Sequence, residues 1–484
     1  MRRFLTLFYL PWALLWGCAE PPPEGETLTI GVGLEPPNLD PTIGAAAAVD
    51  EVVYANLFEG LTRIDRNGNV QPALAMSWDV LDAGRLYRFR LVPNAVFHNG
   101  VPFTADIAKQ SLDRITAPGS ANAQQQLFKG ITSVRASSIH TLDIMLTAPD
   151  PEFLFKLGWG DAVMVEPSTL ASNASQPVGT GPYRFARWIT GTSITLERFE
   201  DYWGERPAAQ QVTFKFISDA AGAYGAIMAG DVDGISNFGA PELLSVIEAT
   251  GRFTVTNGMT EGETVLGLNM KRAPFDDIRV RKAIAMAIDR GALIDGALYG
   301  YGVPIGSFFS PLHPAYVDLT RAAPFDPAMA KQLLAQANVP QDWLPVLKLP
   351  PTGYARRGGE IIAAQLRQVG LDVTLEAIDW PQWLSTVLGQ GDYDMTIVSH
   401  TEPMDIGFFA RPDNYFGYDS AAFRNQLESG DLAAAQRQLA VDQAAVFLFQ
   451  LPQVGVWRKE ITGQWQNAPI QANDVTAIQW IGSS

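Results

Sequence analysis

Cysteine and charge are both scarce in this chain of 484 residues, which has one cysteine and 18% charged residues. The single cysteine, Cys18, excludes an intrachain disulfide and any cysteine-based metal site or nucleophile in the mature domain. Beyond the N-terminal segment no stretch approaches roughly 18 uninterrupted apolar residues, which excludes a polytopic membrane protein. The sequence also has no fixed-period repeat and no low-complexity block, which excludes solenoids and propellers.

The charge balance is acidic, with 51 Asp and Glu against 35 Lys and Arg and a formal charge of −16. No stretch gathers Lys and Arg into the stripe that a phosphate backbone requires, so we expect no nucleic-acid partner. The same charge disfavours adhesion to anionic lipid, so membrane attachment must come from the terminus or a covalent lipid. Hydrophobic residues make up 47% and aromatic residues 10%, which indicates a globular protein with more than one core.

The N-terminal segment has the features of an export signal followed by a tether. Two arginines precede an apolar run over residues 4–16, which is too short to span a bilayer and predicts a signal peptide at residues 1–17. The run ends in LWGC at residues 15–18, which resembles a bacterial lipobox apart from its tryptophan. This likeness implies acylation of Cys18, and cleavage by the ordinary signal peptidase is the alternative. The proline-rich residues 18–26 then form a short, stiff tether to the membrane.

Beyond the tether, strand and helix patterns alternate along the chain. Residues 27–32 alternate as a strand, and residues 46–59 are expected to form a helix. Thr104 is expected to cap the start of another helix, and residues 278–289 have the strongest helical pattern, with apolar side chains near one face. From residue 329 onward helices and strands alternate, which predicts an α/β lobe with a mixed or parallel sheet.

The residue types that catalysis requires do not come together in the sequence. Residues 31–33 begin like a dinucleotide fingerprint, but Pro36 stands where its third glycine belongs. His400-Thr401-Glu402 matches the His-x-Glu of zinc deaminases, whose second half requires cysteines that this chain lacks. The four histidines have no metal-ligand spacing, and no Gly-x-Ser-x-Gly elbow occurs. We therefore expect no enzymatic activity, no cofactor and no metal.

A series of short motifs occurs in an order that points to one family. The motifs are PNLDP at 37–41, LFEGL at 57–61, PALA at 72–75, SW at 77–78, FRL at 89–91, FHNGVPFTAD at 97–106, GTGPY at 179–183, YWG at 202–204, GDVD at 230–233, LN at 268–269, PFDD at 274–277, RVRKA at 279–283 and GDYD at 391–394. Their joint order and spacing resemble the extracellular solute-binding proteins of dipeptide, oligopeptide and nickel importers, family 5. The resemblance extends over nearly the whole mature chain.

This resemblance implies an α/β fold, a two-lobe periplasmic-binding-protein clamshell of the class II or cluster C type. It also implies an extra α+β subdomain in the first lobe. On this basis we place lobe I at residues 27–258 and 455–484, its extra subdomain at 54–177, and lobe II at 259–454. The chain then crosses the hinge twice, and a ligand stabilises the closed form by touching both lobes.

The resemblance also implies where the ligand binds, in the loop after a second-lobe strand at residues 394–398 and on the helix before it. In dipeptide and oligopeptide binders this loop carries a carboxylate that pairs with the ligand's α-amino group, three residues before a second acidic position. Glu402 and Asp405 reproduce that spacing. The ligand-binding residues that we expect are Glu402, Asp405, His400, Thr401, Trp380, Trp383 and Arg411.

Several of these candidates also have an ordinary structural interpretation. Core packing is the alternative for Trp380 and Trp383, which stand at i and i+3 on one predicted helix. For Arg411 the alternative to a ligand carboxylate is a surface ion pair, and Glu402 has the alternative of capping its loop or pairing with Arg411. The glycines of residues 179–183 are better explained by a tight turn than by a ligand contact.

The implied function is that of the substrate-binding component of an ABC importer, with a peptide or peptide-like solute as ligand and the transmembrane permease subunits as partners. We expect a periplasmic monomer, anchored to the membrane through an N-terminal lipid. Two departures keep other ligands open, because the chain has Glu402 where peptide binders carry Asp and His400 where they usually carry Trp. The alternatives are an opine-like, glycosylated or nickel-chelate ligand, and a ligand-sensing receptor instead of an importer.

Overall fold

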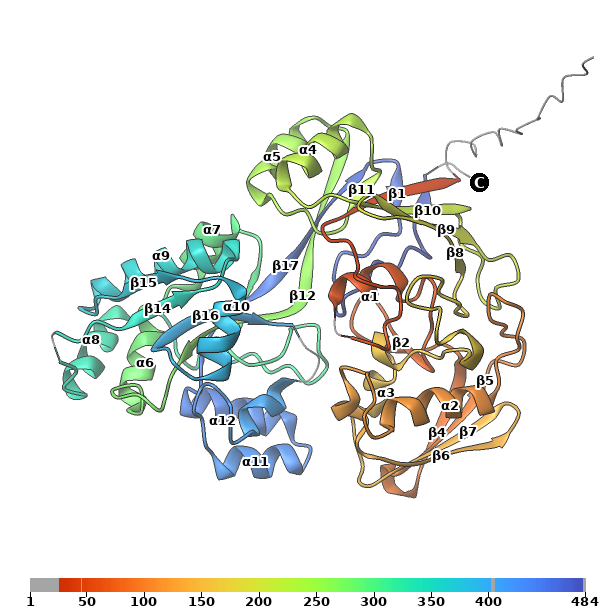
Figure 1. Ribbon diagram of the computed structural model, residues 1–484. Coiled ribbons are helices and arrows are strands. Elements are labelled where there is room, and N and C mark those ends of the chain that lie inside the picture. The colour runs from red at the N-terminus through yellow and green to blue at the C-terminus, as the bar shows by residue number, and fades with distance from the viewer. Residues whose placement is uncertain (1–25, 45, 341, 402–404, 482–484) are drawn as a thin grey trace, which may run out of the picture.

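Two lobes joined by a pair of long strands make up the molecule (Figure 1). The computed structural model describes residues 26–44, 46–340, 342–401 and 405–481. The joining strands, β12 (Phe253–Leu268) and β17 (Val446–Arg458), pair antiparallel, and their register shifts between Met259 and Glu263. The chain thus passes twice between the lobes. The lobe boundaries at residues 258/259 and 454/455 fall within these two strands and stay a prediction.

One mixed sheet of eleven strands continues through both lobes. Its strands on the first-lobe side are β1 (Thr27–Val32), β8 (Tyr183–Ile189), β9 (Ser193–Arg198), β10 (Gln211–Phe216) and β11 (Gly234–Ile235). Those on the second-lobe side are β13 (Val303–Pro304), β14 (Val346–Leu349), β15 (Thr374–Ala377) and β16 (Met395–His400). The order is β15-β14-β16-β12-β17-β11-β1-β10-β9-β8, with β13 also on β17. β1 is parallel to both neighbours, as is β14, and the remaining pairs are antiparallel.

The first lobe carries an extra subdomain with a core of its own. Its four-stranded sheet has the order β4-β5-β7-β6 and packs on one helix. The elements are β4 (Ala75–Leu81), β5 (Leu86–Leu91), β6 (Ile131–Ser138), β7 (Thr141–Leu146) and α2 (Ala105–Thr116). Alternation places Tyr87, Phe89 and Leu91 on the buried face of β5. The hairpin β2 (Thr62–Ile64) and β3 (Val70–Pro72) precedes this sheet.

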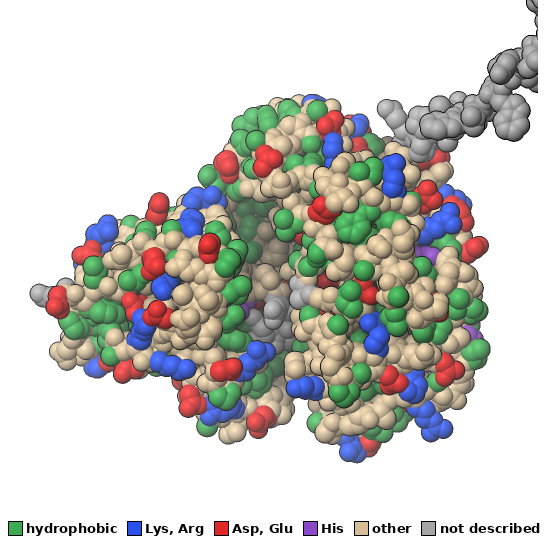
Figure 2. Space-filling model, in the orientation of Figure 1, with side chains coloured by type: hydrophobic (Ala, Val, Ile, Leu, Met, Phe, Trp, Pro, Cys, Tyr) green, Lys and Arg blue, Asp and Glu red, His purple; other side chains and the backbone are tan. Residues whose placement is uncertain are grey.

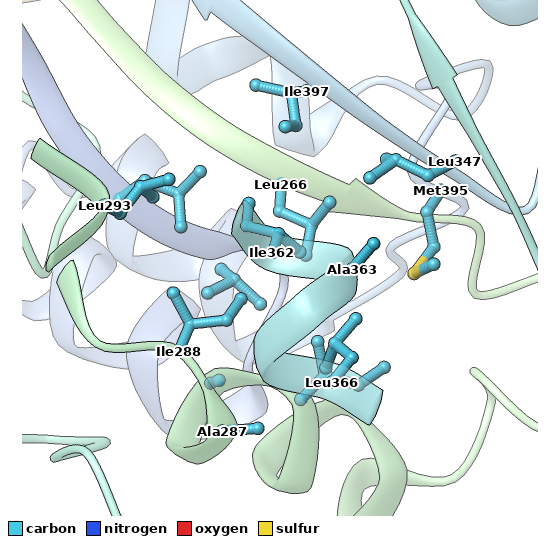
Figure 3. Close-up of a cluster of buried hydrophobic side chains, with 14 of the residues drawn as sticks. Leu266, Ala287, Ile288, Leu293, Leu347, Ile362, Ala363, Leu366, Met395 and Ile397 are labelled. Carbon is cyan, nitrogen blue, oxygen red and sulfur yellow. The ribbon is translucent and has the colours of Figure 1, made fainter. Parts of the chain in front are cut away.

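Helices cover the second-lobe part of the large sheet and bury a shared core with it (Figure 3). They include α6 (Ile278–Ala287), α7 (Arg290–Leu298), α8 (Pro327–Gln336) and α9 (Gly353–Gln368). Ile362 and Leu366 of α9 are fully buried against Leu347 of β14 and Ile397 of β16, because residues four apart share one face of a helix. A second cluster lies under α10 (Trp380–Trp383), the π-helical turn η6 (Leu384–Gly389), α11 (Ala421–Glu428) and α12 (Leu432–Asp442).

The end of the chain returns to the first lobe after β17. There the Trp480 indole N–H of β19 (Gln479–Trp480) donates to the Thr27 carbonyl oxygen at 3.2 Å, and β19 pairs with β18 (Ile461–Thr462). The remaining helices of this lobe are α1 (Ala47–Val53), α3 (Phe153–Lys156), α4 (Ala220–Ala229) and α5 (Leu244–Ala249), with the short turns η1 (Asp82–Gly84), η2 (Gln125–Phe128), η3 (Gly160–Ala162), η4 (Pro167–Thr169) and η5 (Pro241–Leu243). Within the described ranges, no helix has the length and apolar character to cross a membrane.

Most of the predicted elements are confirmed, and two helices are shorter than expected, of which the one predicted at residues 278–289 ends at Ala287. β1 spans residues 27–32 as expected, and the Thr104 hydroxyl accepts a hydrogen bond from the Ile107 amide at the start of α2. The helix expected over residues 46–59 ends at Val53. It ends there because Tyr54 turns to an extended backbone, with its hydroxyl donating to the Gly158 carbonyl oxygen at 2.8 Å.

Candidate functional site

A cavity of about 380 Å³ lies in the cleft between the lobes, beside the strands that join them. Figure 2 shows the cleft as a hollow between the two lobes. First-lobe residues that line the cavity include Glu51 of α1 and Trp159. Second-lobe residues that line it include Tyr354 of α9 and Thr401, which follows β16. Because walls of one cavity come from both lobes, a molecule held there touches both lobes at once.

The joining strands form the floor of this cavity. Thr260 to Gly262 of β12 and Leu451 to Val454 of β17 line it. The Gln450 side-chain amide of β17 donates to the Thr260 carbonyl oxygen at 2.6 Å, across the irregular part of the strand pair. A ligand at this floor therefore lies against the segment about which the lobes can turn.

Of the predicted ligand-binding residues, Thr401 lines the cavity and is exposed. His400, one residue earlier, is half-buried in an aromatic cluster of the second lobe. Its Nε2 lies 2.9 Å from the Tyr415 hydroxyl, and its ring stacks parallel to that of Tyr415. The edge contact with Phe308, at 5.2 Å between ring centroids, fixes the imidazole from another side. These second-lobe contacts hold His400 in place, and it is not among the residues that line the cavity.

The two tryptophans of α10 differ in exposure. Trp383 is 4% exposed, and its indole N–H donates to the Thr396 hydroxyl of β16 at 3.0 Å, so it occupies the second-lobe core. Trp380 is 37% exposed and meets Trp383 edge-on at 5.7 Å. Neither residue is among those that line the cavity. For Trp383 this placement matches the core-packing interpretation of the sequence.

The remaining predicted residues belong to the loop after β16. Glu402 lies outside the described residues, as does the side chain of Asp405, whose backbone begins η7 (Asp405–Ala410). Arg411 is exposed, and its guanidinium lies over the Phe408 ring at 5.3 Å. The roles of these three side chains in ligand binding stay predictions.

The first-lobe wall carries a group of acidic side chains that sequence reasoning missed. Burial raises the pKa of Glu51 to about 7, and that of Asp161 in η3 also to about 7. Burial, followed by the charges of Asp161 and Glu51, raises the pKa of Asp50 well above its usual range. Within the described residues, one carboxylate oxygen of Asp50 and one of Asp161 are buried without a hydrogen-bond partner. The only sign of this group in the sequence is the pair of adjacent acidic residues at positions 50 and 51, which belongs to no known motif.

Three of the sequence motifs meet away from the cleft, at the carboxylate of Glu59. Its Oε1 accepts a hydrogen bond from the Tyr202 hydroxyl, and its Oε2 accepts from the Trp203 indole and the Thr180 hydroxyl, all at 2.9 Å. Burial raises the pKa of Glu59 to about 7 against the opposing effect of these donors. The motifs LFEGL, GTGPY and YWG therefore share a structural role in joining segments of the first lobe.

The glycines of GTGPY are required by close backbone contact. A Cβ atom at Gly179 would lie 1.8 Å from the Leu57 carbonyl oxygen, and one at Gly181 would lie 2.5 Å from the Asn56 carbonyl oxygen. Both distances are far shorter than any van der Waals contact, so only glycine fits. This finding agrees with the structural interpretation of the motif.

Residues 69–436 match the family described as "Bacterial extracellular solute-binding proteins, family 5 Middle". This chain belongs to that family. The resemblance inferred from the motif order is confirmed, and the two-lobe architecture is that of its structural relatives.

Relatives of this solute-binding protein cover most of its length. The glutathione-binding protein GsiB of Pectobacterium atrosepticum is 29% identical over 402 residues, which cover 81% of this chain and 76% of GsiB. Among solved structures, AgaA of A. tumefaciens R10 in complex with agropinic acid has a TM-score of 0.76 at 24% identity, covering 94% of this chain and 98% of AgaA. DppA of Helicobacter pylori in complex with the peptide STSA has a TM-score of 0.76 at 22% identity, with the same coverage.

Proposed function

We propose that this protein is the substrate-binding component of an ABC importer, which captures a peptide or peptide-like solute between its lobes and delivers it to the permease. The observation that carries the proposal is the cavity of about 380 Å³ whose walls come from both lobes and whose floor is the joining strand pair. Its volume falls within the range of roughly 300–1,000 Å³ that small-molecule sites occupy. The relative GsiB is a glutathione-binding protein, and glutathione is a tripeptide.

The lining of the cavity suits such a ligand. Trp159 and Tyr354 offer flat apolar faces from opposite lobes, and the backbone and side chains of Ser236 and Asn237 offer polar partners. Closure of the lobes removes water from the cleft and strengthens these polar contacts. In the loop after β16 we keep Glu402 as the partner of a ligand amine, with Asp405 as the second acidic position.

We further propose export and lipid anchoring at the N-terminus. Cleavage before Cys18 and acylation of its thiol would leave residues 18–26 as a tether between the lipid and the binding domain. We propose that this domain is a monomer in the periplasm. Globomycin, which blocks lipoprotein signal peptidase, should then leave an uncleaved precursor. A mature protein with a free, unacylated N-terminus would overturn this part of the proposal.

In the proposed function the protein binds and releases its ligand without changing it chemically. We therefore propose no enzymatic activity. The family relatives are solute-binding proteins. Within the described residues, no group of three or more His, Asp and Glu side chains could hold a metal ion.

An opine-like solute is a second candidate ligand. It is favoured by the AgaA complex with agropinic acid, which has this fold, and by the departures at positions 400 and 402 from the peptide-binder pattern. Nickel-chelate and glycosylated ligands, and a sensory role, remain the wider alternatives.

Mass spectrometry of small molecules released by denaturing the protein from its native host tests the ligand class directly. The proposal predicts a peptide or peptide-like compound at about one per protein. Added back to the refolded protein, that compound should reduce the radius of gyration measured by X-ray scattering and raise the melting temperature. Binding without compaction would contradict capture between the lobes.

A further inference from the structure

The charged side chains that line the interlobe cavity are all acidic. They are Glu51 from α1 of the first lobe and Glu261 from the joining strand β12. Among the described residues that line this cavity, none is Lys, Arg or His. The first-lobe wall of this cavity therefore presents the carboxylate of Glu51 to a ligand.

Among the residues that the structure describes, Glu51 has no charge partner. No hydrogen bond or ion pair to its carboxylate is found within the described residues, although Asn473 binds its backbone carbonyl oxygen at 3.1 Å. Burial raises its pKa to about 7, and no cation in the described part of the chain acts in the opposite direction. A carboxylate kept in a cleft at this electrostatic cost is a functional-site candidate because a positive ligand group would relieve the cost.

Two further acidic side chains lie behind Glu51, and burial favours the neutral acid in both. Asp50 on the same helix and Asp161 on η3 interact with each other, and Asp50 packs so closely against Gly160 that a Cβ there would lie 2.3 Å from its Oδ1. Asp161 is 4% exposed, and one of its carboxylate oxygens is buried without a partner in the described part of the chain. Trp159, next to this group, also lines the cavity, and its side chain is 7% exposed.

We propose that the hinge side of the cleft binds a positively charged group of the ligand, an ammonium or a guanidinium, through Glu51 of the first lobe. The inference rests on the proposed function, since it assumes that the interlobe cavity is the ligand site. It adds a charge preference to that site: ligands with a cationic group are bound, and ligands with an additional carboxylate in this position are rejected. Glu51 belongs to the first lobe, whereas the sequence assigns Glu402 to the second lobe, so the two carboxylates would hold separate parts of the ligand.

Calorimetric titration with tripeptides tests this preference and separates the two sources of positive charge. The probes are Ala-Ala-Ala, Ala-Lys-Ala and Ala-Glu-Ala, each with a free and with an acetylated N-terminus. A preference for free over acetylated Ala-Ala-Ala assigns the α-amine to Glu51, and a preference for acetylated Ala-Lys-Ala over acetylated Ala-Ala-Ala assigns a basic side chain. We expect at least one of these preferences to be about 10-fold or more, as for a hydrogen bond to a charged group.

The variant Glu51→Gln should abolish the preference that the wild type shows, and Glu51→Asp should retain part of it. The matched control Glu428→Gln changes an exposed glutamate at the end of α11, outside the cavity, and should leave the preference intact. Glu51→Gln removes a charge that has no partner among the described residues, so the melting temperature of the variant should not fall below that of the wild type.

A second measurement needs no variant. The pKa values of the neighbouring Asp50 and Asp161 are also raised, so proton uptake by either of them acts in the same direction as proton uptake by Glu51. The preference for the cationic tripeptide should therefore shrink as the pH falls from 8 to 6, around the pKa of about 7 for Glu51.

Tight binding of tripeptides with the same preference in wild type and Glu51→Gln would overturn this inference and leave the proposed function in place. Preferred binding of Ala-Glu-Ala would do the same. Failure of every tripeptide to bind the wild type would instead refute the peptide class of the proposed function, and this inference with it.

Discussion

Replacement of Glu59 by Gln tests whether burial or hydrogen bonding dominates at the carboxylate that joins three sequence motifs. Three side-chain donors at 2.9 Å favour the charged form of Glu59, whereas burial favours the neutral form. The balance raises its pKa from 4.5 to about 7. The folded protein therefore holds a proton on Glu59 that the unfolded chain has already released between these two pH values.

This bound proton determines whether the free energy of unfolding rises or falls with pH. Because the folded state binds more protons, the contribution of Glu59 to the free energy of unfolding is fully present below pH 4.5 and is lost as the pH rises through about 7. A shift of 2.5 pKa units, the difference between 7 and 4.5, corresponds to at most about 3 kcal/mol. Gln does not titrate. Relative to the wild type, Glu59→Gln should therefore gain stability by up to about 3 kcal/mol between pH 5 and pH 8.

Urea unfolding monitored by circular dichroism at pH 5, 6, 7 and 8 measures this difference. The matched control is Glu205→Gln, which removes an exposed glutamate beside the same segment and should give a difference that does not change with pH. Glu59→Ala should lose stability at every pH because it leaves the Tyr202, Trp203 and Thr180 donors without an acceptor. A difference between Glu59→Gln and wild type that stays constant with pH, or that falls as the pH rises, would refute the reasoning.

Three further predictions concern the same lobe and the second-lobe core. Burial lowers the pKa of His98 to about 4, and its Nδ1 accepts a hydrogen bond from the Gly179 amide. The free energy of unfolding of the wild type should therefore fall by up to about 3 kcal/mol from pH 6.5 to pH 4, whereas that of His98→Gln should not. The same pH dependence in both proteins would contradict this. Gly179→Ala should lower the free energy of unfolding by at least about 3 kcal/mol, because the new Cβ atom would overlap the Leu57 carbonyl oxygen. A melting temperature equal to that of the wild type would argue against this contact. Trp383→Phe should lower the free energy of unfolding by about 1 to 2 kcal/mol, because it removes the hydrogen bond from the indole to the Thr396 hydroxyl. Its ligand affinity should be unchanged, and a large rise in Kd would return Trp383 to the ligand site.

Part of this structure could be predicted from the sequence because it depends on interactions between residues that are close together in the chain. Thr104 caps α2 because a short polar side chain satisfies a free amide at a helix start. The alternating residues 27–32 form β1 because each second side chain reaches the core. The order of the motifs determined the family, since glycines such as Gly179 fit only where two backbones meet. The placement of the site in the cleft came from that family likeness.

The tertiary structure alone decided the contacts between segments that are distant in the chain. Arg281, for example, is 7% exposed and donates to the backbone carbonyl oxygens of Phe275, Asp276, Asp442 and Gln443. Glu51 and Trp159 are more than 100 positions apart in the sequence, yet they line one cavity with Thr401. Sequence periodicity reports which face of one element is buried, but not which other element covers it. The charge of the cleft depends on how several such elements pack together, so it became visible only in the folded protein.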